Sequence, residues 1–288
     1  MSRNGITGID HILLAVRDLD AARMGWTRLG FTLSPRGKHL GRGTGNYCIM
    51  FLRDYVELFG IVGTERVSPE YTQFLAVREG PMKLAWATDD STAAVAALSA
   101  RGLHPDAPRD LGRQLELPEG TVVPRFKIVA LPQEETPALS SFICEQPTPE
   151  LMRRPEWLVH ANGATGLVGV TIIVDDTAPL VDAYERLFGP ANVHTTDDIV
   201  TVRVGPHRIL FAEAEDFVAM YPEIDIDERV TVPFIAVLTL KVIDPEATID
   251  YLTNWQIPHE ALPDRRVLVP AEEANGAVLE FTVTVSPR

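Results

Sequence analysis

Two side chains near the N-terminus have types and settings that suit metal chemistry. Glu57 lies between the apolar residues Val56 and Leu58, and burying its carboxylate without a partner would be costly, which favours a cation or a strong hydrogen-bond donor nearby. His11 lies near the start of the apolar stretch 8–19. A lone histidine on a strand is more often a hydrogen-bonded core residue. Its pairing with Glu57 nevertheless favours a metal ligand, because a neutral imidazole nitrogen and a carboxylate oxygen together suit a divalent ion.

The composition is that of a globular protein without polyanionic partners. The 288 residues are 45% hydrophobic, which is enough for a full core and two domains. A formal charge of −14, spread without long runs of one sign, would repel nucleic acids and anionic membranes. No stretch approaches the roughly 20 apolar residues of a membrane span, and no signal peptide is recognisable. We therefore expect a cytoplasmic protein in which Cys48 and Cys144 are buried free thiols.

The stretch that holds His11 belongs to a pattern, an apolar strand ending in aspartate, that occurs four times. The copies span residues 10–18, 82–90, 168–176 and 235–244. Only the first copy contains a histidine. An amphipathic helix pattern follows each copy, and an acid or hydroxyl suited to capping marks its start. Each unit closes with a compact apolar strand, at residues 55–60, 141–146, 208–212 and 277–283.

This order of one strand, one helix and three strands predicts an α+β fold of four βαβββ modules. We expect an N-terminal pair of modules at 1–146, a linker at 147–165 and a C-terminal pair at 166–288. An insertion rich in Pro, Arg and Glu at 105–137 either rims a site or is a surface excursion. The acidic run 213–228 is typical of a mostly solvated connector.

Several motifs resemble the vicinal oxygen chelate superfamily, which includes glyoxalase I, bleomycin-resistance proteins, fosfomycin-resistance enzymes and extradiol dioxygenases. They are the Asp-His-Ile opening and Ala-Val-x-Asp end of residues 10–18, the Arg-Leu-Gly-Phe helix end at 28–31, and Glu57 within its apolar strand. A narrower similarity to a glyoxalase-like branch is carried by residues 38–46, 50–51 and 155–164.

The resemblance implies that the modules pair into two curved-sheet cups and that a divalent metal ion (Fe, Mn, Ni, Co or Zn) lies in the first cup. It assigns His11 and Glu57 as ligands that leave positions open for a bidentate substrate. In the second module, the position of the expected histidine falls at Lys83 or Leu84.

The third metal ligand depends on which side chains of the second closing strand point inward. Gln146 points inward if Phe142 and Cys144 do, and Glu145 points inward if Ile143 does. We prefer Gln146, because the strand resembles the matching strand of the glyoxalase-like branch, which ends in a polar ligand at this place, and because an amide oxygen can coordinate a hard cation.

The second half lacks the ligand set. Gly169 and Val237 stand where histidines would, and Glu280 remains as a lone acid. We therefore expect the second cup to be filled by apolar side chains or closed.

Further polar residues are candidates for substrate contact. His39 and Asn46 lie in a Gly-rich loop region before a strand, where contact with substrate competes with loop-stabilising hydrogen bonds. His160 is a third candidate, although it and Asn162 are more typical of residues that fix the turn between the halves. Surface positions are expected for the remaining histidines, His104, His194, His207 and His259.

The resemblance implies a metal-dependent lyase or isomerase of the glyoxalase type that acts on a small metabolite with vicinal oxygens. Glu57 or Glu145 would move the proton. A non-haem iron dioxygenase using the same cup is the first alternative. A protein that binds and sequesters a small molecule without chemistry is the second. A homodimer is possible in each case.

Overall fold

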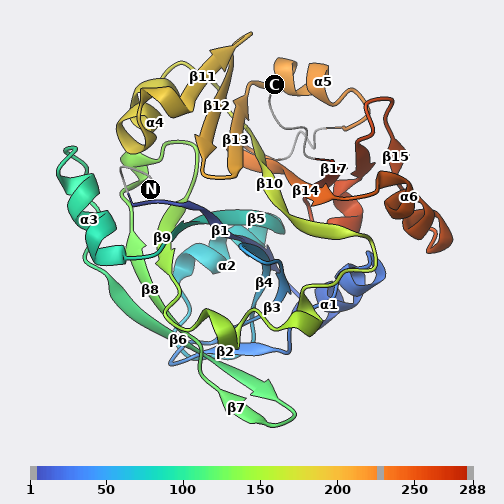
Figure 1. The fold of residues 1–288 in the computed structure, drawn as a ribbon, viewed down its shortest axis with the longest axis horizontal. Coiled ribbons are helices and arrows are strands. Elements are labelled where there is room, and N and C mark those ends of the chain that lie inside the picture. Colours follow the sequence, from blue (N-terminus) through green and yellow to red (C-terminus); the bar gives the residue numbers. More distant parts are fainter. Residues whose placement is uncertain (1–4, 226–229, 284–288) are drawn as a thin grey trace.

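The computed structural model describes residues 5–225 and 230–283, and its strands form two curved sheets (Figure 1). The first sheet contains β1 (Gly8–Val16), β2 (Gly37–His39), β3 (Thr44–Met50), β4 (Tyr55–Ile61), β5 (Gly80–Thr88), β6 (Arg109–Leu117), β7 (Gly120–Val122), β8 (Arg125–Ala130) and β9 (Ser141–Glu145). The second contains β10 (Ala164–Ile173), β11 (Val193–Thr196), β12 (Ile199–Val204), β13 (His207–Ala212), β14 (Phe234–Val242), β15 (Glu260–Ala261), β16 (Val267–Val269) and β17 (Val278–Thr282). The helices are α1 (Leu19–Arg28), α2 (Pro69–Val77), α3 (Ser91–Ser99), α4 (Leu180–Phe188), α5 (Ala214–Met220) and α6 (Pro245–Asn254). The α+β class is confirmed.

The first sheet closes on itself. Its strand order is β2-β3-β4-β1-β5-β9-β8-β6-β7, and β2 pairs in addition with β6. The ring from β2 to β6 is therefore an eight-stranded barrel, with β7 outside it, rather than the expected open cup. The reason is that β6, which belongs to the insertion at 105–137, supplies the strand that closes the ring and places Arg113 opposite His39. The second sheet stays open, in the order β11-β12-β13-β10-β14-β17-β16-β15.

The recurring aspartates cap helices, as the pattern predicts. The carboxylates of Asp18, Asp90 and Asp244 accept backbone N–H groups in the first turns of α1, α3 and α6. These bonds satisfy donors that have no partner inside the helix. The third unit differs, because α4 follows Pro179 and has no side-chain cap.

Two helices, α2 and α5, are absent from the predicted module pattern. Helix α5 occupies part of the run 213–228, so the connector is helical there, but most of its described residues are exposed or half-buried, as predicted for a mostly solvated connector. Residues 226–229 lie outside the described part of the chain. Phe217 and Tyr221 are only 1% and 4% exposed. Their spacing of four residues directs both rings to one side of the chain, where they pack on the second sheet.

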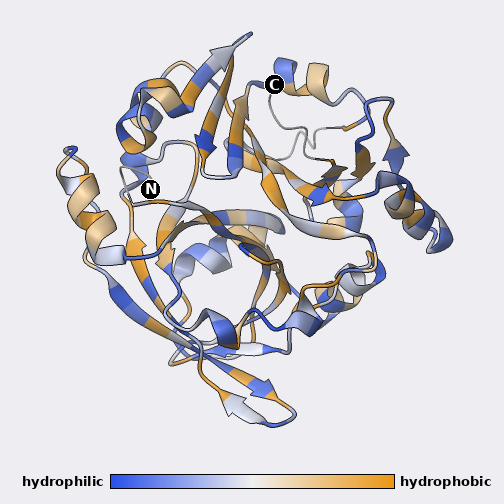
Figure 2. Cartoon of the chain, viewed as in Figure 1, coloured by the Kyte–Doolittle hydropathy of each residue, from blue (hydrophilic) through white to orange (hydrophobic). Residues whose placement is uncertain are grey.

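A large apolar core includes residues from both sheets and the helices between them. Trp26 and Trp86 are fully buried in it. The Trp86 ring lies 5.0 Å from the ring of Phe188 on α4, so the two halves pack directly on each other. Hydrophobic residues lie along central strands such as β1, whereas the residues of α6 are largely hydrophilic (Figure 2). No helix in the described chain is long and apolar enough to cross a membrane.

Candidate functional site

A cavity of about 520 Å³ lies inside the barrel, a volume suited to a small molecule. All eight barrel strands contribute to its wall, together with the first turn of α2. Apolar side chains lie at both ends. Leu75 of α2 packs beside Leu13 at one end, and Met152 and Trp157 from the segment between the sheets join the cluster at the other.

His11 projects from β1 into this cavity and is 5% exposed. Its Nδ1 atom lies 2.6 Å from Asp10 Oδ1, so the carboxylate of Asp10 accepts the Nδ1 proton and the lone pair remains on Nε2. The imidazole ring stacks on Tyr55 at 4.5 Å and meets the edge of Phe142 at 5.5 Å. These contacts fix both the tautomer and the plane of the ring.

Glu57 lies across from His11, as expected. His11 Nε2 is 3.5 Å from Glu57 Oε2, and His39 Nε2 is 3.6 Å from Glu57 Oε1. Both separations exceed the roughly 2.7–2.9 Å of a charge-assisted hydrogen bond. Asn46 Nδ2 also donates to Glu57 Oε1. The structure therefore brings four predicted site residues, His11, His39, Asn46 and Glu57, into one cluster.

The protonation states of this cluster suit a metal ion. Burial lowers the pKa of His39 to about 4, so its ring is neutral near pH 7. Burial would raise the pKa of Glu57, but the fields of His11, His39 and Arg113 and the hydrogen bond from Asn46 outweigh it, and the pKa lies below the ordinary value. An ionised carboxylate that faces an imidazole lone pair in a buried site is a donor set that a divalent cation fits.

A second potential ligand group consists of Asp10, His11 and Cys144, whose ligand atoms lie within 4.8 Å of one another. Here the carboxylate of Asp10 already has hydrogen-bond partners. Its Oδ1 atom accepts from His11 Nδ1 at 2.6 Å, and Gln146 Nε2 donates to Oδ2 at 2.7 Å and to Oδ1 at 3.0 Å. Burial and the neighbouring Asp10 raise the pKa of the Cys144 thiol well above its usual value. We therefore interpret Asp10 as the residue that orients His11 toward Glu57, an arrangement common for metal-binding histidines.

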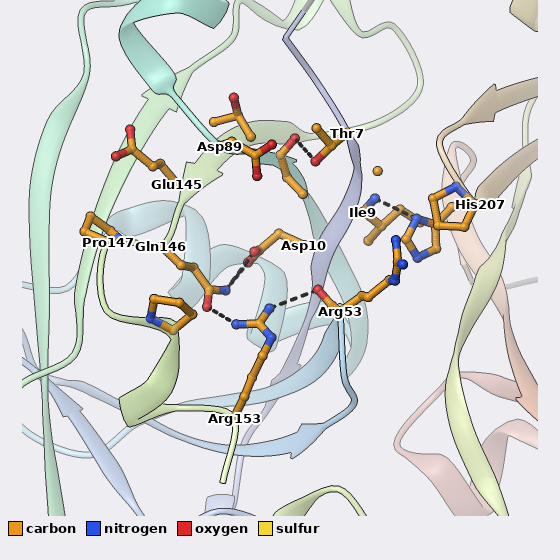
Figure 3. Close-up of a pocket in the computed structure, with 15 residues that line it drawn as sticks. Thr7, Ile9, Asp10, Arg53, Asp89, Glu145, Gln146, Pro147, Arg153 and His207 are labelled. Carbon is orange, nitrogen blue, oxygen red and sulfur yellow. Dashed lines mark hydrogen bonds between the residues drawn. The ribbon is translucent and has the colours of Figure 1, made fainter. Parts of the chain in front are cut away.

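Gln146, the preferred third ligand, lies on the other side of Asp10, beside a separate cavity of about 580 Å³ between the two sheets (Figure 3). Its amide nitrogen donates to Asp10, and its oxygen accepts from Arg153 Nη1 at 2.5 Å. Gln146 thus reaches His11 only through Asp10.

Glu145 also lies beside this second cavity. Its Oε2 atom accepts hydrogen bonds from the N–H and hydroxyl groups of Ser91, at 2.8 and 2.6 Å, where α3 begins. The structure therefore does not bring Glu145 or Gln146 into the barrel cavity.

The strand register explains this difference. In the first module, His11 opposes Tyr55 and Leu13 opposes Glu57. In the second module, Ala85 opposes Phe142, so the position that matches Glu57 is Phe142, well before Gln146. Of the two residues considered for the missing histidine, Lys83 lines the cavity, whereas Leu84 is buried in the large core.

His160 lies outside both cavities. Its Nδ1 atom accepts from the Thr32 N–H at 3.0 Å, and its Nε2 atom lies 3.0 Å from the Met50 carbonyl oxygen, to which it donates. Both ring nitrogens are thus used by backbone groups, and burial lowers the pKa of His160 to about 4. The neighbouring Asn162 fixes the turn between the halves, donating to the Leu29 carbonyl oxygen at 2.9 Å.

The expectation that His207 lies on the surface is wrong, because it is only 4% exposed. Its Nδ1 atom accepts from the Ile9 N–H at 3.0 Å, and its Nε2 atom lies 3.0 Å from Asp54 Oδ2. Asp54 also accepts from the Leu167 N–H at 2.9 Å. The pair joins both sheets, and sequence spacing gave no signal for it, because the contacts are long-range.

The second sheet has no comparable cluster among its described residues. A Cβ at Gly169 would overlap the backbone carbonyl of Arg208, so no side chain fits there. By register, Leu210 takes the place of Glu57. The hydroxyl of Tyr221 donates to Glu280 Oε2 at 2.6 Å. Arg266 Nη1 lies 3.7 Å from the same oxygen, its guanidinium packs over the Tyr221 ring, and apolar side chains pack around Tyr221, so side chains fill the space beside Glu280.

The comparisons with known proteins agree with this fold. Residues 9–188 match the family described as a glyoxalase-like domain. A hypothetical protein from Staphylococcus aureus has a similar structure, with a TM-score of 0.66 and 12% identity over 96% of this chain and 99% of that one. A mutant of 4-hydroxymandelate synthase from Streptomyces coelicolor gives a TM-score of 0.62 and 11% identity over 98% and 92%.

A third similar structure is a fusion of a xylose isomerase-like TIM barrel with 4-hydroxyphenylpyruvate dioxygenase. Its TM-score is 0.55 at 13% identity, and the match covers 98% of this chain and 50% of the fusion. No curated protein matches by sequence. These structures show the fold, and the family match covers more than half of the sequence. The chain therefore belongs to the glyoxalase-like domain family, within the vicinal oxygen chelate superfamily.

Proposed function

We propose that the chain is a metal-dependent lyase or isomerase that acts in the barrel cavity on a small metabolite carrying two adjacent oxygen atoms. The observation that carries the proposal is the arrangement of His11, whose Nδ1 atom is held by Asp10 while Nε2 faces Glu57 at 3.5 Å. His11 and Glu57 would hold the metal ion. His39 lies close enough to Glu57 to be the third ligand.

A bound divalent ion would supply Lewis acidity to the two substrate oxygens. The protein's own groups would do the rest. Glu57 is ionised at neutral pH, because its pKa is lowered, and can accept a proton from a carbon next to the polarised oxygen. Asn46 holds the carboxylate in place through its amide N–H. Tyr55 and Phe142 pack on the His11 ring and keep water from that side.

A second candidate function, a non-haem iron dioxygenase, is favoured by His39. Two histidines and one carboxylate around open positions are the ligand set typical of iron(II) oxygenases. Two of the similar structures are, by their names, 4-hydroxymandelate synthase and a fusion containing 4-hydroxyphenylpyruvate dioxygenase. The missing second-module histidine is consistent with either chemistry.

Reconstitution without oxygen tests the proposal. The metal-free protein is loaded with Fe, Mn, Co, Ni or Zn, and bound metal and turnover of a panel of α-hydroxyaldehydes and α-keto acids are measured. Turnover without oxygen supports a lyase or isomerase. Oxygen consumption with iron alone selects the dioxygenase. A ligand that binds tightly and is recovered unaltered would replace both with sequestration, and unchanged metal content in His11→Ala would overturn the metal site.

We also propose that each sheet is built from two βαβββ modules, with paired units at 1–146 and 166–288 joined by the segment 147–165. The support is the same pairing scheme in both sheets. The first strand of each module runs parallel to its closing strand, as in β1 with β4 and β10 with β13. The two first strands of each sheet pair antiparallel, β1 with β5 and β10 with β14.

A further inference from the structure

Arg113 is a buried cation in the cavity wall, only 2% exposed. Its Nη1 and Nη2 atoms donate to two sulfur atoms, Cys48 Sγ at 3.1 Å and Met152 Sδ at 2.7 Å. Its Nε atom has no hydrogen-bond partner among the described residues. Sulfur is a weak acceptor, so the guanidinium is poorly satisfied for a charge that is costly to bury.

No carboxylate of the described chain forms an ion pair with Arg113. The nearby acid, Glu57, is within ion-pair distance of His11 and His39. Burial would lower the pKa of Arg113, but the neighbouring Cys48, Tyr55 and Glu57 outweigh it and raise the pKa further above its usual value, so the guanidinium stays charged. A permanently charged group without a paired anion is a receptor for an anion from outside.

The fold places Arg113 beside the proposed metal ligands. It opposes His39 across the β2–β6 seam that closes the barrel, and opposing residues of antiparallel strands project to the same face. Its Nη1 partner Cys48 opposes Glu57 on β4. At Gly37, a Cβ would collide with Asn46 Oδ1 and Arg113 Cδ, so the glycine makes room for the guanidinium stem.

The rest of the cavity lining also has more basic than acidic side chains, although the chain as a whole carries a formal charge of −14. Its basic lining residues are Arg42, Arg66, Lys83, Arg109 and Arg113, against the two acids Glu57 and Glu70. A concave surface lined by one sign of charge attracts the opposite charge.

Building on the proposed function, we infer that Arg113 binds a carboxylate of the substrate and thereby selects carboxylic acids over neutral compounds of the same shape. The planar guanidinium can engage a carboxylate through two parallel N–H···O bonds once it leaves its sulfur partners. The aromatic residues of the cavity wall, Tyr55, Phe59, Tyr71, Phe126 and Phe142, then contact the remaining body of the substrate. The substrate class is a small carboxylic acid with an apolar portion.

Titration calorimetry of the metal-free protein with benzoate and with benzamide, its neutral counterpart of equal size, tests this inference. We expect the wild type to bind benzoate at least 10-fold more tightly than benzamide. Arg113→Met should remove this preference and leave benzamide binding unchanged, whereas Arg125→Met, at an exposed arginine of β8 outside the cavity lining, should change benzoate affinity less than threefold. Equal binding of the two probes by the wild type, or an unchanged preference in Arg113→Met, would overturn the inference.

Two further variants keep the test independent of folding and of the metal site. Arg113→Lys retains the charge but loses the planar fork, so its preference for benzoate should fall between those of the wild type and Arg113→Met. His11→Ala should keep the benzoate preference while losing metal. Loss of the preference in the folded His11→Ala variant would place the anion at the histidine and refute the role of Arg113. Failure of metal binding with an intact preference would instead refute only the metal-dependent function.

Discussion

The two sheets carry the same order of elements apart from the additional strand β7 in the first, but they differ in what the inserted helix does. In the first sheet, α2 follows β4 and lines the cavity only with its first turn, including Tyr71. In the second, α5 follows β13, and Phe217 and Tyr221 pack onto the sheet, where Tyr221 binds Glu280. A chemical site therefore needs both a ligand set and an empty space. The first sheet has both, whereas the second has one acid whose surroundings are filled.

The largest effect should come from removing a proposed ligand. His11→Ala or Glu57→Gln should lower metal affinity at least about 100-fold. Each variant loses an atom that would coordinate the metal directly, while the other ligands stay in place. Equilibrium dialysis with elemental analysis measures the bound metal. The matched variant in the second half, Glu280→Gln, should leave the metal content unchanged, and metal loss in that variant would show that the halves do not differ as proposed.

The filled face of the second sheet should be more sensitive to truncation than the cavity wall. Tyr221→Ala should lower the free energy of unfolding by about 3–5 kcal/mol, because it empties a packed site and removes a hydrogen-bond donor to the buried carboxylate of Glu280. Tyr71→Ala should cost less than about 2 kcal/mol, because that ring borders an existing cavity. Urea unfolding of both variants measures the difference, and equal losses would contradict the contrast between α2 and α5.

The residues that hold His11 in place should affect metal affinity less than His11 itself. Gln146→Leu removes the amide that holds Asp10, and metal affinity should fall by about 10–100-fold. Glu145→Gln, the neighbouring control, should leave it within twofold, because that carboxylate binds Ser91. If Gln146→Leu abolished metal binding as completely as His11→Ala, Gln146 would be a direct ligand after all.

The smallest effect concerns the joint between the halves. Burial lowers the pKa of His160 from 6.5 to about 4. Between pH 6.5 and 4, His160 is therefore protonated in the unfolded chain but neutral in the folded chain. The contribution of His160 to the free energy of unfolding is fully present above about pH 6.5 and is lost as the pH falls toward 4. Wild type should lose about 1–2 kcal/mol more than His160→Gln between pH 7 and 5 in urea unfolding. Parallel losses would show that another group dominates.

Local features of the structure could be predicted from the sequence. The capping aspartates, the closing strands and the buried thiols follow from neighbours within a few residues, because capping geometry and side-chain alternation are local properties. The proximity of His11 and Glu57 could also be predicted, because both belong to one module whose first and last strands pair. The absence of a ligand at Gly169 needed only the residue type.

Contacts between distant segments were decided by the tertiary structure. The seam between β2 and β6 placed Arg113 beside His39, and the pairing of β9 with β5 placed Phe142 rather than Gln146 at the position that matches Glu57. Period-two alternation says which residues share a face, but pairing of distant strands sets which residues meet. The burial of His207 against Asp54 depends in the same way on how the two sheets pack. The sequence alone therefore predicts metal chemistry at His11 and Glu57, whereas the charge and space around them come from segments joined only in the folded chain.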